Sequence, residues 1–276
     1  MTIDLFAVRS ILFLPASNPR AIAKAREAGA DLVVLDLEDA VKPEHKEAAR
    51  QAAVDAAAEP WPMPVAIRVN GVASQWHDDD LEAAAHSKAD LVVLPRTASA
   101  DVIRATKEWF DRPVLAMIET AAGVLAAAEI SHEAAALIAG TNDLSADLRL
   151  PPDAGRQPLQ MALQSIVLAG RASGIAVFDG VFNGLKQTDD FTAQAAEGRR
   201  LGFDGKSLIH PSQVEPCHRV FAPSEAEIDR ARRLLEAATG GAERFEDQMI
   251  ERMHVEVAER LLARAGRHPG EGTPSK

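Results

Sequence analysis

The chain has 276 residues, 47% of them hydrophobic, and its 30 Lys and Arg against 41 Asp and Glu give a formal net charge of −11 at pH 7. This acidity argues against nucleic acids and anionic membranes as partners. The single cysteine, Cys217, excludes disulfides within the chain and thiolate metal clusters. Residues 1–9 show neither a signal peptide nor a membrane span, so the cytoplasm is the expected compartment.

Short apolar runs alternate along the chain with segments of helical pattern. In chain order the runs cover residues 11–15, 32–39, 65–70, 91–96, 114–119, 134–139, 176–180 and 206–211. Strands this uniformly apolar are typical of a parallel sheet that is covered on both faces. The repeated unit predicts a TIM barrel, an α/β fold whose functional side chains lie at the carboxyl ends of the strands.

A doubly wound open sheet is the alternative fold. Dinucleotide-binding versions of that fold carry a Gly-x-Gly-x-x-Gly turn after the first strand. Here the chain reads Leu14-Pro-Ala-Ser-Asn-Pro at that point. Dinucleotide binding therefore has no support.

Two carboxylates, Glu119 and Asp143, follow consecutive apolar runs. Either alone is most often a helix cap or a solvated loop residue. Because right-handed crossovers bring the carboxyl ends of neighbouring parallel strands to one rim, the two are expected to converge. Adjacent carboxylates repel each other unless a proton or cation lies between them, and an all-oxygen site suits Mg²⁺ better than zinc.

Arg68 lies in an otherwise apolar run, where an unpaired charge would be costly. An internal ion pair with Glu38 is one interpretation. A guanidinium that faces the carboxylate of a bound ligand is the other, and both can hold at once.

The chain beyond the eighth run divides into two further segments. An amphipathic helix is predicted over residues 246–265, after the Gly240-Gly241 break, and the last residues are rich in Gly, Pro and Ser. The predicted organisation is a barrel over residues 1–238, a helical extension over 239–266 that packs on the barrel or on a neighbouring subunit, and a disordered tail over 267–276.

Six motifs in this order resemble the citrate lyase beta-subunit family, within the superfamily of citrate lyases, malyl-CoA lyases and 2-keto-acid aldolases. The resemblance extends from Arg9 to Glu236. The motifs are Arg9-Ser-Ile-Leu-Phe-Leu-Pro-Ala, Leu35-Asp-Leu-Glu-Asp-Ala-Val, Ile67-Arg-Val-Asn, Met117-Ile-Glu-Thr, Gly140-Thr-Asn-Asp-Leu and Gly205-Lys-Ser-Leu-Ile-His-Pro.

The resemblance implies a Mg²⁺-dependent barrel with Glu119 and Asp143 as metal ligands. It also implies that Arg68 binds substrate and stabilises the oxyanion, with the acidic Glu38 beside it. Arg9, which opens the first motif, is expected to bind substrate together with Glu119, Arg68 and Asp39. The aldolase branch usually has a histidine where this chain has Asp39, which favours the thioester branch.

In the thioester lyases of this group an aspartate near the C-terminus, in a Met-Ile-Asp context, commonly reaches over the site of a neighbouring subunit. This chain has Asp247-Gln-Met-Ile-Glu251, so Glu251 is the matching position. The alternative is that Glu251 lies on the solvated face of an amphipathic helix whose packed side carries Ile250, His254, Val257 and Leu261. The resemblance implies a homotrimer or hexamer.

The predicted function is carbon–carbon cleavage of a citryl, citramalyl or malyl thioester to a 2-keto acid, such as oxaloacetate, and an acetyl thioester. The thioester partner is either CoA or an acyl-carrier protein. The alternatives are a 2-keto-acid aldolase acting on pyruvate or glyoxylate, and a non-catalytic barrel that binds a keto acid. The loop over residues 150–158, Ser17 and Asn183 are candidates for substrate selection.

Overall fold

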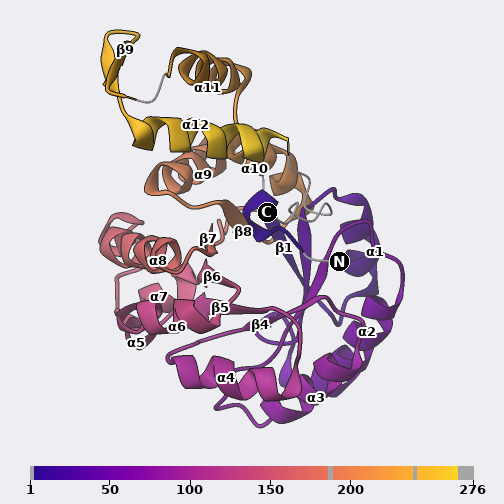
Figure 1. Cartoon of the computed structure of the whole chain (residues 1–276). Helices are drawn as coiled ribbons and strands as arrows, with labels where there is room; N and C mark the ends of the chain where they lie inside the picture. Colours follow the sequence, from indigo (N-terminus) through magenta and orange to yellow (C-terminus); the bar gives the residue numbers. More distant parts are fainter. Residues whose placement is uncertain (1–2, 186–188, 239–240, 267–276) are drawn as a thin grey trace.

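The computed structural model describes residues 3–185, 189–238 and 241–266. Parallel strands close into a barrel in chain order, with β8 returning to pair with β1 (Figure 1). The predicted TIM barrel is confirmed. The barrel strands are β1 (Ser10–Pro15), β2 (Leu32–Asp36), β3 (Val65–Arg68), β4 (Leu91–Leu94), β5 (Val114–Ile118), β6 (Ala136–Ala139), β7 (Ala176–Asp179) and β8 (Gly205–Leu208).

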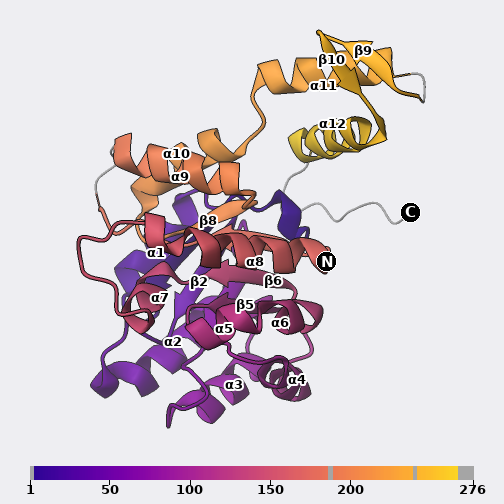
Figure 2. The same cartoon turned by 90° about the vertical axis from the view of Figure 1, so that its left-hand side faces the viewer.

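Helices cover the outside of the barrel (Figures 1 and 2). They are α1 (Pro19–Glu27), α2 (Lys46–Ala58), α3 (His77–His86), α4 (Ala100–Trp109), α5 (Ala121–Leu125), α6 (Ala127–Glu133), α7 (Thr141–Asp147), α8 (Gln160–Ala172), α9 (Asp189–Leu201) and α10 (Val214–Phe221). Single 3-10 turns occupy Leu5–Ala7, Pro43–His45, Gln157–Leu159 and Pro211–Gln213. No helix in the described ranges is long and apolar enough to cross a membrane.

The strands alternate their side chains between two hydrophobic clusters. In β2, Leu32 and Val34 belong to the cluster that fills the barrel, while Val33 and Leu35 belong to the one between strands and helices. Both faces are buried, which explains why the apolar runs show no polar alternation. The same two-residue period decides which residue at the end of each strand points into the barrel.

The C-terminal segment forms a separate small unit beside the barrel. It contains α11 (Glu225–Ala237), a hairpin of β9 (Glu243–Phe245) and β10 (Gln248–Ile250), and α12 (Arg252–Ala265). A third cluster, which includes Leu234, Ile250 and Ala258, packs α11, β10 and α12 together. In both views this unit projects away from the barrel (Figures 1 and 2).

The prediction of one helix over residues 246–265 is wrong in its first part. Glu246 and Asp247 have positive φ angles of 46° and 61° at the turn of the hairpin, which interrupts any helix there. The helix begins only at Arg252. The predicted tail over 267–276 and the Gly240 side of the predicted break lie outside the described residues.

Arg9 lies at the end of the barrel opposite to the strand carboxyl ends, because it precedes β1. Its backbone N–H and Nε both donate to Asp31 Oδ2 at 2.8 Å, and Asp31 precedes β2. Ser10 Oγ lies 2.8 Å from His218 Nε2 on the same rim. The expectation that Arg9 binds substrate is therefore wrong, since the residue is engaged in an ion pair that fixes the amino-terminal rim.

His218 makes the stability of this rim pH-dependent. Burial lowers the pKa of His218, an effect that the nearby Asp31 opposes and Arg9 reinforces. The unfolded chain, with an ordinary histidine pKa of about 6.5, therefore binds more protons in mild acid than the folded chain does. The contribution of neutral His218 is complete above that pH and is lost as the pH falls below it.

We expect urea unfolding to show that stability falls as the pH is lowered through the ordinary histidine pKa of about 6.5, and that His218→Gln makes this fall smaller. Glutamine keeps a polar side chain but does not titrate. An unchanged loss in the variant would contradict the role of His218.

Candidate functional site

Three charged residues point into the barrel at the carboxyl ends of their strands. Asp36 ends β2, Arg68 ends β3 and Glu119 directly follows β5. Each continues the inward alternation of its strand, as Glu119 does after Leu115 and Met117. All three are buried. Strand period and parallel topology therefore bring these charges together above the barrel core.

The guanidinium of Arg68 is held by two carboxylates. Nε and Nη2 donate to Asp36 Oδ1 and Oδ2 at 2.7 and 2.6 Å, a bidentate pair, and Nη1 lies 2.8 Å from Glu38 Oε2. Burial disfavours its charge, but Asp36 and then Glu38 raise the pKa of Arg68 above its ordinary value. Its carbon Cζ lies 5.3 Å from the centre of the Phe13 ring. Arg68 is thus a fixed cation, oriented before any ligand arrives.

Glu38 is the weaker partner of Arg68. Its buried Oε2 has close ion-pair contact with Arg68 but no hydrogen bond of good geometry in the described structure. Burial raises the pKa of Glu38 to about 8, although Arg68 acts in the opposite direction. The predicted Arg68–Glu38 ion pair is present, but Asp36 takes the stronger, bidentate position.

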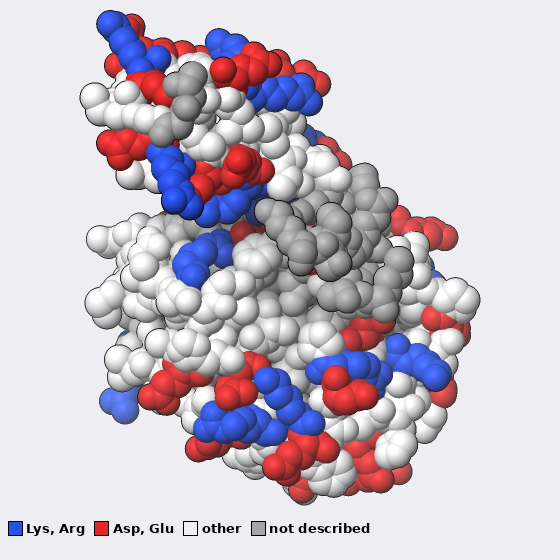
Figure 3. Space-filling model, viewed as in Figure 1, with Lys and Arg blue, Asp and Glu red and all other residues white. Residues whose placement is uncertain are grey.

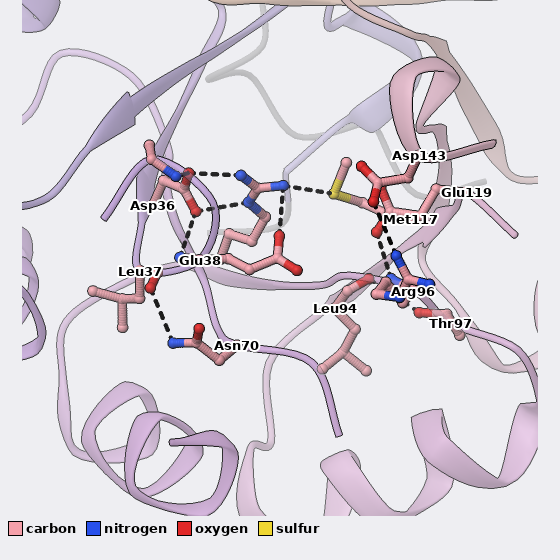
Figure 4. A network of polar contacts seen from close by, with 12 residues as sticks. Asp36, Leu37, Glu38, Asn70, Leu94, Arg96, Thr97, Met117, Glu119 and Asp143 are labelled. Carbon is pink, nitrogen blue, oxygen red and sulfur yellow. Dashed lines mark hydrogen bonds and ion pairs between the residues drawn. The ribbon is translucent and has the colours of Figure 1, made fainter. Parts of the chain in front are cut away.

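Glu119 and Asp143 meet across Arg96. The Arg96 backbone N–H donates to Glu119 Oε1 at 2.5 Å, and its Nη1 donates to Asp143 Oδ1 at 2.9 Å (Figure 4). Burial, and to a lesser extent the charge of Asp143, raise the pKa of Glu119 to about 7, although the hydrogen bond from the Arg96 N–H acts in the opposite direction. The fold therefore brings the two predicted carboxylates together, and the positive charge of Arg96 offsets part of their mutual repulsion.

The approach of the two carboxylates depends on Gly140. A β-carbon at this position would overlap the β-carbon and Oε2 of Glu119. Gly140 is also the N-cap of α7, and Asp143 lies in the first turn of that helix. The helix start thus projects Asp143 toward the strand-end Glu119, and only glycine leaves space for both.

Four of these charged residues, Asp36, Arg68, Glu119 and Asp143, line one cavity of about 420 Å³. Arg68 and Asp36 lie on one part of its wall, and Glu119 and Asp143 on another. In Figure 4, Met117 lies between Glu38 and the carboxylates of Glu119 and Asp143. A second cavity, of about 590 Å³, is lined by Glu38, Lys46, Trp76 and Arg96. Asp39 is on the wall of both.

The carboxylate pair fits a hard divalent cation. Its oxygens come from a buried Glu119, 2% exposed, and from Asp143, whose side chain is 34% exposed toward the cavity. No cluster of three or more His, Cys, Asp or Glu with metal-binding geometry occurs in the described part of the chain. A cation here would take its remaining ligands from water and substrate, which is the arrangement that Mg²⁺ favours.

The remaining expected residues have different positions. Asp39 is on the cavity wall, as expected, and so is Asn183, which exchanges amide hydrogen bonds with Asn142. Glu251 lies in the extension, outside the lining of the main cavity, and lines a separate cavity of about 260 Å³ there. It is the N-cap of α12, where its backbone N–H donates to His254 Nδ1 at 3.0 Å, and it is exposed. Glu251 is solvent-exposed, as the helical-face interpretation expects, but it is the N-cap of the helix and not part of its face.

Two residues at the site, Asp36 and Arg96, were not among the predicted site residues. Asp36 shares the inward face of β2 with Leu32 and Val34, and the strand period predicts that it shares this face with Glu38, but Arg68 was expected to pair with Glu38 only. Arg96 follows Leu94-Pro95 at the end of β4, a position where any charged residue faces the functional rim. The positive φ of Arg96, 48°, and its bond to Glu119 depend on the folded turn and have no signal in the sequence.

Sequence comparison identifies relatives along almost the whole chain. The model of the HpcH/HpaI aldolase/citrate lyase family matches residues 9–211. A (3S)-malyl-CoA thioesterase of Cereibacter sphaeroides is 40% identical over 272 residues, covering 93% of this chain and 94% of that protein. The citrate lyase subunit beta of Escherichia coli is 34% identical over 280 residues, covering 93% of each.

Solved structures agree with the sequence comparison. The protein CitE from Mycobacterium tuberculosis, in complex with magnesium, acetoacetate and coenzyme A, matches with a TM-score of 0.83 and 34% identity over 95% of this chain and 100% of that one. The citrate lyase beta subunit of the same organism, complexed with oxaloacetate and magnesium, matches with a TM-score of 0.72 and 33% identity over 79% and 99%. With its closed barrel and its motifs in order, the chain belongs to the HpcH/HpaI aldolase/citrate lyase family.

Proposed function

We propose that this protein is a Mg²⁺-dependent carbon–carbon lyase that cleaves a malyl-type CoA thioester to a 2-oxo acid and acetyl-CoA. The observation that carries the proposal is a single cavity with the Glu119–Asp143 pair on one wall and the fixed Arg68 on another. A substrate with a carboxylate next to a hydroxyl group complements this arrangement. The relatives that act on malyl-CoA or that bind magnesium with a keto acid support this substrate class.

When bound, Mg²⁺ would be held by Glu119 and Asp143 and would act as a Lewis acid that lowers the pKa of the substrate hydroxyl. Arg68 would stabilise negative charge on that oxygen as it becomes a carbonyl group. Because Asp36 already fixes the guanidinium, little reorganisation is needed during the reaction. The carbon–carbon bond then breaks, and its electron pair remains with the acetyl thioester as an enolate.

Two protons must move in this reaction. The hydroxyl proton needs an acceptor, and the enolate carbon needs a donor. Glu38, next to Arg68 and with a pKa of about 8, is the proposed acceptor, since it can exchange a proton near neutral pH. The proposed donor is Glu251 of a second copy of the chain. Glu251 is exposed, and it does not line the main cavity of its own subunit.

A second copy is supported by exposed apolar surface. The extension exposes Met249, Met253 and Val257, at 68%, 58% and 55%. The left side of Figure 3, over α8, shows few charges, and exposed Met161 and Leu168 lie on that helix. Such surfaces are typical of protein contacts. We propose a homo-oligomer, a trimer or hexamer, in which the extension of one subunit covers the cavity of the next.

Thioester hydrolysis is the second candidate function. It is favoured by the 40% identity to the (3S)-malyl-CoA thioesterase. It would use the same substrate and release malate and free CoA. An aldolase without thioester chemistry is disfavoured, because Asp39 stands where that branch has its histidine and no histidine occurs among the described residues that line the main cavity.

The products formed from malyl-CoA decide between the two functions. With Mg²⁺ present we expect glyoxylate and acetyl-CoA, measured by chromatography in parallel with citryl-CoA and citramalyl-CoA. Glu119→Ala should reduce the rate by at least about a hundredfold, because it removes a carboxylate from the electrostatic centre of the reaction. Glu108→Ala, which changes an exposed glutamate on α4, is the matched control and should retain the rate.

Malate and free CoA as the only products would favour the thioesterase and exclude the lyase. Products that form equally well with Glu119→Ala would contradict the proposed site. If none of the three thioesters is cleaved, the proposed lyase function is wrong, and keto-acid binding would then indicate a non-catalytic barrel.

Complementation tests the proposed donor from a neighbouring subunit. Glu119→Ala and Glu251→Gln should each be nearly inactive alone. When the two are coexpressed, part of the activity should return, because mixed oligomers contain sites with an intact Glu119 and an intact neighbouring Glu251. The control is coexpression of Glu119→Ala with Asp143→Asn, which impairs every site and should restore nothing. Full activity of Glu251→Gln alone would contradict the role of this residue.

A further inference from the structure

Arg96 makes two different contacts with the proposed cation site. Its backbone N–H donates to Glu119 Oε1 and its side-chain Nη1 donates to Asp143 Oδ1. The residue connects β4 to α4 and lies in a turn, with a positive φ of 48°. In Figure 4 Arg96 lies directly against the Glu119–Asp143 pair.

The backbone contact belongs to the rigid part of the fold. The next residue, Thr97, is buried and donates its N–H to the Met117 carbonyl at 3.0 Å, while its hydroxyl donates to the Leu94 carbonyl at 3.0 Å. These bonds tie the turn to β4 and β5. The N–H of Arg96 therefore keeps its direction toward Glu119 whatever the side chain does.

The side-chain contact is of a different kind. The Arg96 side chain is 51% exposed and that of Asp143 is 34% exposed, so their ion pair is weak and exchangeable. Arg96 also lines the second cavity, of about 590 Å³, which offers space for the guanidinium away from Asp143. The side chain can thus leave Asp143 without any movement of the turn.

A divalent cation and this guanidinium compete for the same carboxylate. A cation between Glu119 and Asp143 needs oxygens of both, and Arg96 Nη1 occupies Asp143 Oδ1. Two positive centres within contact distance of one carboxylate also repel each other. Binding of the cation is therefore coupled to loss of the Arg96–Asp143 pair.

We propose that the Arg96 side chain is a latch on the cation site, which neutralises Asp143 while the site is empty of metal and is displaced toward the second cavity when a divalent cation binds. The Arg96 backbone N–H continues to position Glu119 in both states. Arg96 is in this sense a positioning residue whose charge sets the affinity of the site. The proposal rests on the cation site of the proposed function.

Removal of the latch should strengthen cation binding. We expect Arg96→Met to bind Mn²⁺ about two- to fivefold more tightly than the wild type, because an exposed ion pair of this kind is worth that much binding free energy. Binding is measured from the electron paramagnetic resonance signal of the free Mn²⁺ ion. Arg104→Met is the matched control, since it removes an exposed arginine paired with Asp101 and Glu133 on α4 and α6. Its Mn²⁺ affinity should equal that of the wild type.

Unfolding measurements separate a latch from a purely structural role. In EDTA, Arg96→Met should be less stable than the wild type, because it lacks the pair with Asp143. In saturating Mg²⁺ this difference in the free energy of unfolding should disappear, because the metal has already broken the Arg96–Asp143 pair of the wild type. By linkage, the change in this difference between EDTA and Mg²⁺ must equal the difference in metal-binding free energy between the two proteins. A structural role predicts the same destabilisation in both conditions.

A measurement on the wild type keeps the proposal testable if Arg96→Met does not fold. The Nε–Hε resonance of Arg96, assigned from its absence in Arg96→Lys, should shift when Mg²⁺ is added. An unshifted resonance in protein that binds the metal, or a Mn²⁺ affinity of Arg96→Met equal to or weaker than that of the wild type, would overturn the latch alone. If the wild type binds no Mn²⁺, the proposed cation site and the latch both fail.

Discussion

The bidentate ion pair between Arg68 and Asp36 is the interaction on which the site depends. It places a guanidinium, 8% exposed, above the hydrophobic interior of the barrel. An unpaired charge at this depth would be strongly destabilising, and removal of one partner of a buried pair typically costs about 3–5 kcal/mol. Asp36 therefore both permits the burial of Arg68 and fixes its direction. Glu38, which reaches the same guanidinium by a less well-oriented contact, is left with a raised pKa and is available for proton exchange.

The part of the cavity wall formed by Glu119 and Asp143 carries an excess of negative charge. Glu119 and Asp143 are two negative groups that Gly140 allows to approach, and Arg96 compensates them only in part. Burial, and to a lesser extent the charge of Asp143, raise the pKa of Glu119 to about 7. A cavity with a fixed cation on one side and an under-neutralised carboxylate pair on the other is suited to an anionic substrate that arrives with a divalent cation. The citrate lyase beta subunit of Mycobacterium tuberculosis has been solved in complex with oxaloacetate and magnesium.

The barrel could be predicted from the sequence because its strands are apolar on both faces and their order repeats. Glu119 and Asp143 could be paired from topology alone, since both follow neighbouring strands. The strand period places Asp36 and Glu38 on one face, but it does not show that Asp36, and not Glu38, makes the bidentate pair with Arg68. Other features depend on packing or on local turns that composition does not encode, namely the hairpin that displaces Glu251 from the predicted helix, the ion pair that keeps Arg9 on the opposite rim, and the φ of Arg96.

A crystal structure with Mn²⁺ and glyoxylate would test the central claim most directly, because the anomalous scattering of manganese locates the ion independently of the protein density. The account predicts one peak within bonding distance of carboxylate oxygens of both Glu119 and Asp143, with the oxo acid completing the coordination and facing Arg68. Manganese bound elsewhere, or an oxo acid bound in this cavity without the metal, would contradict it.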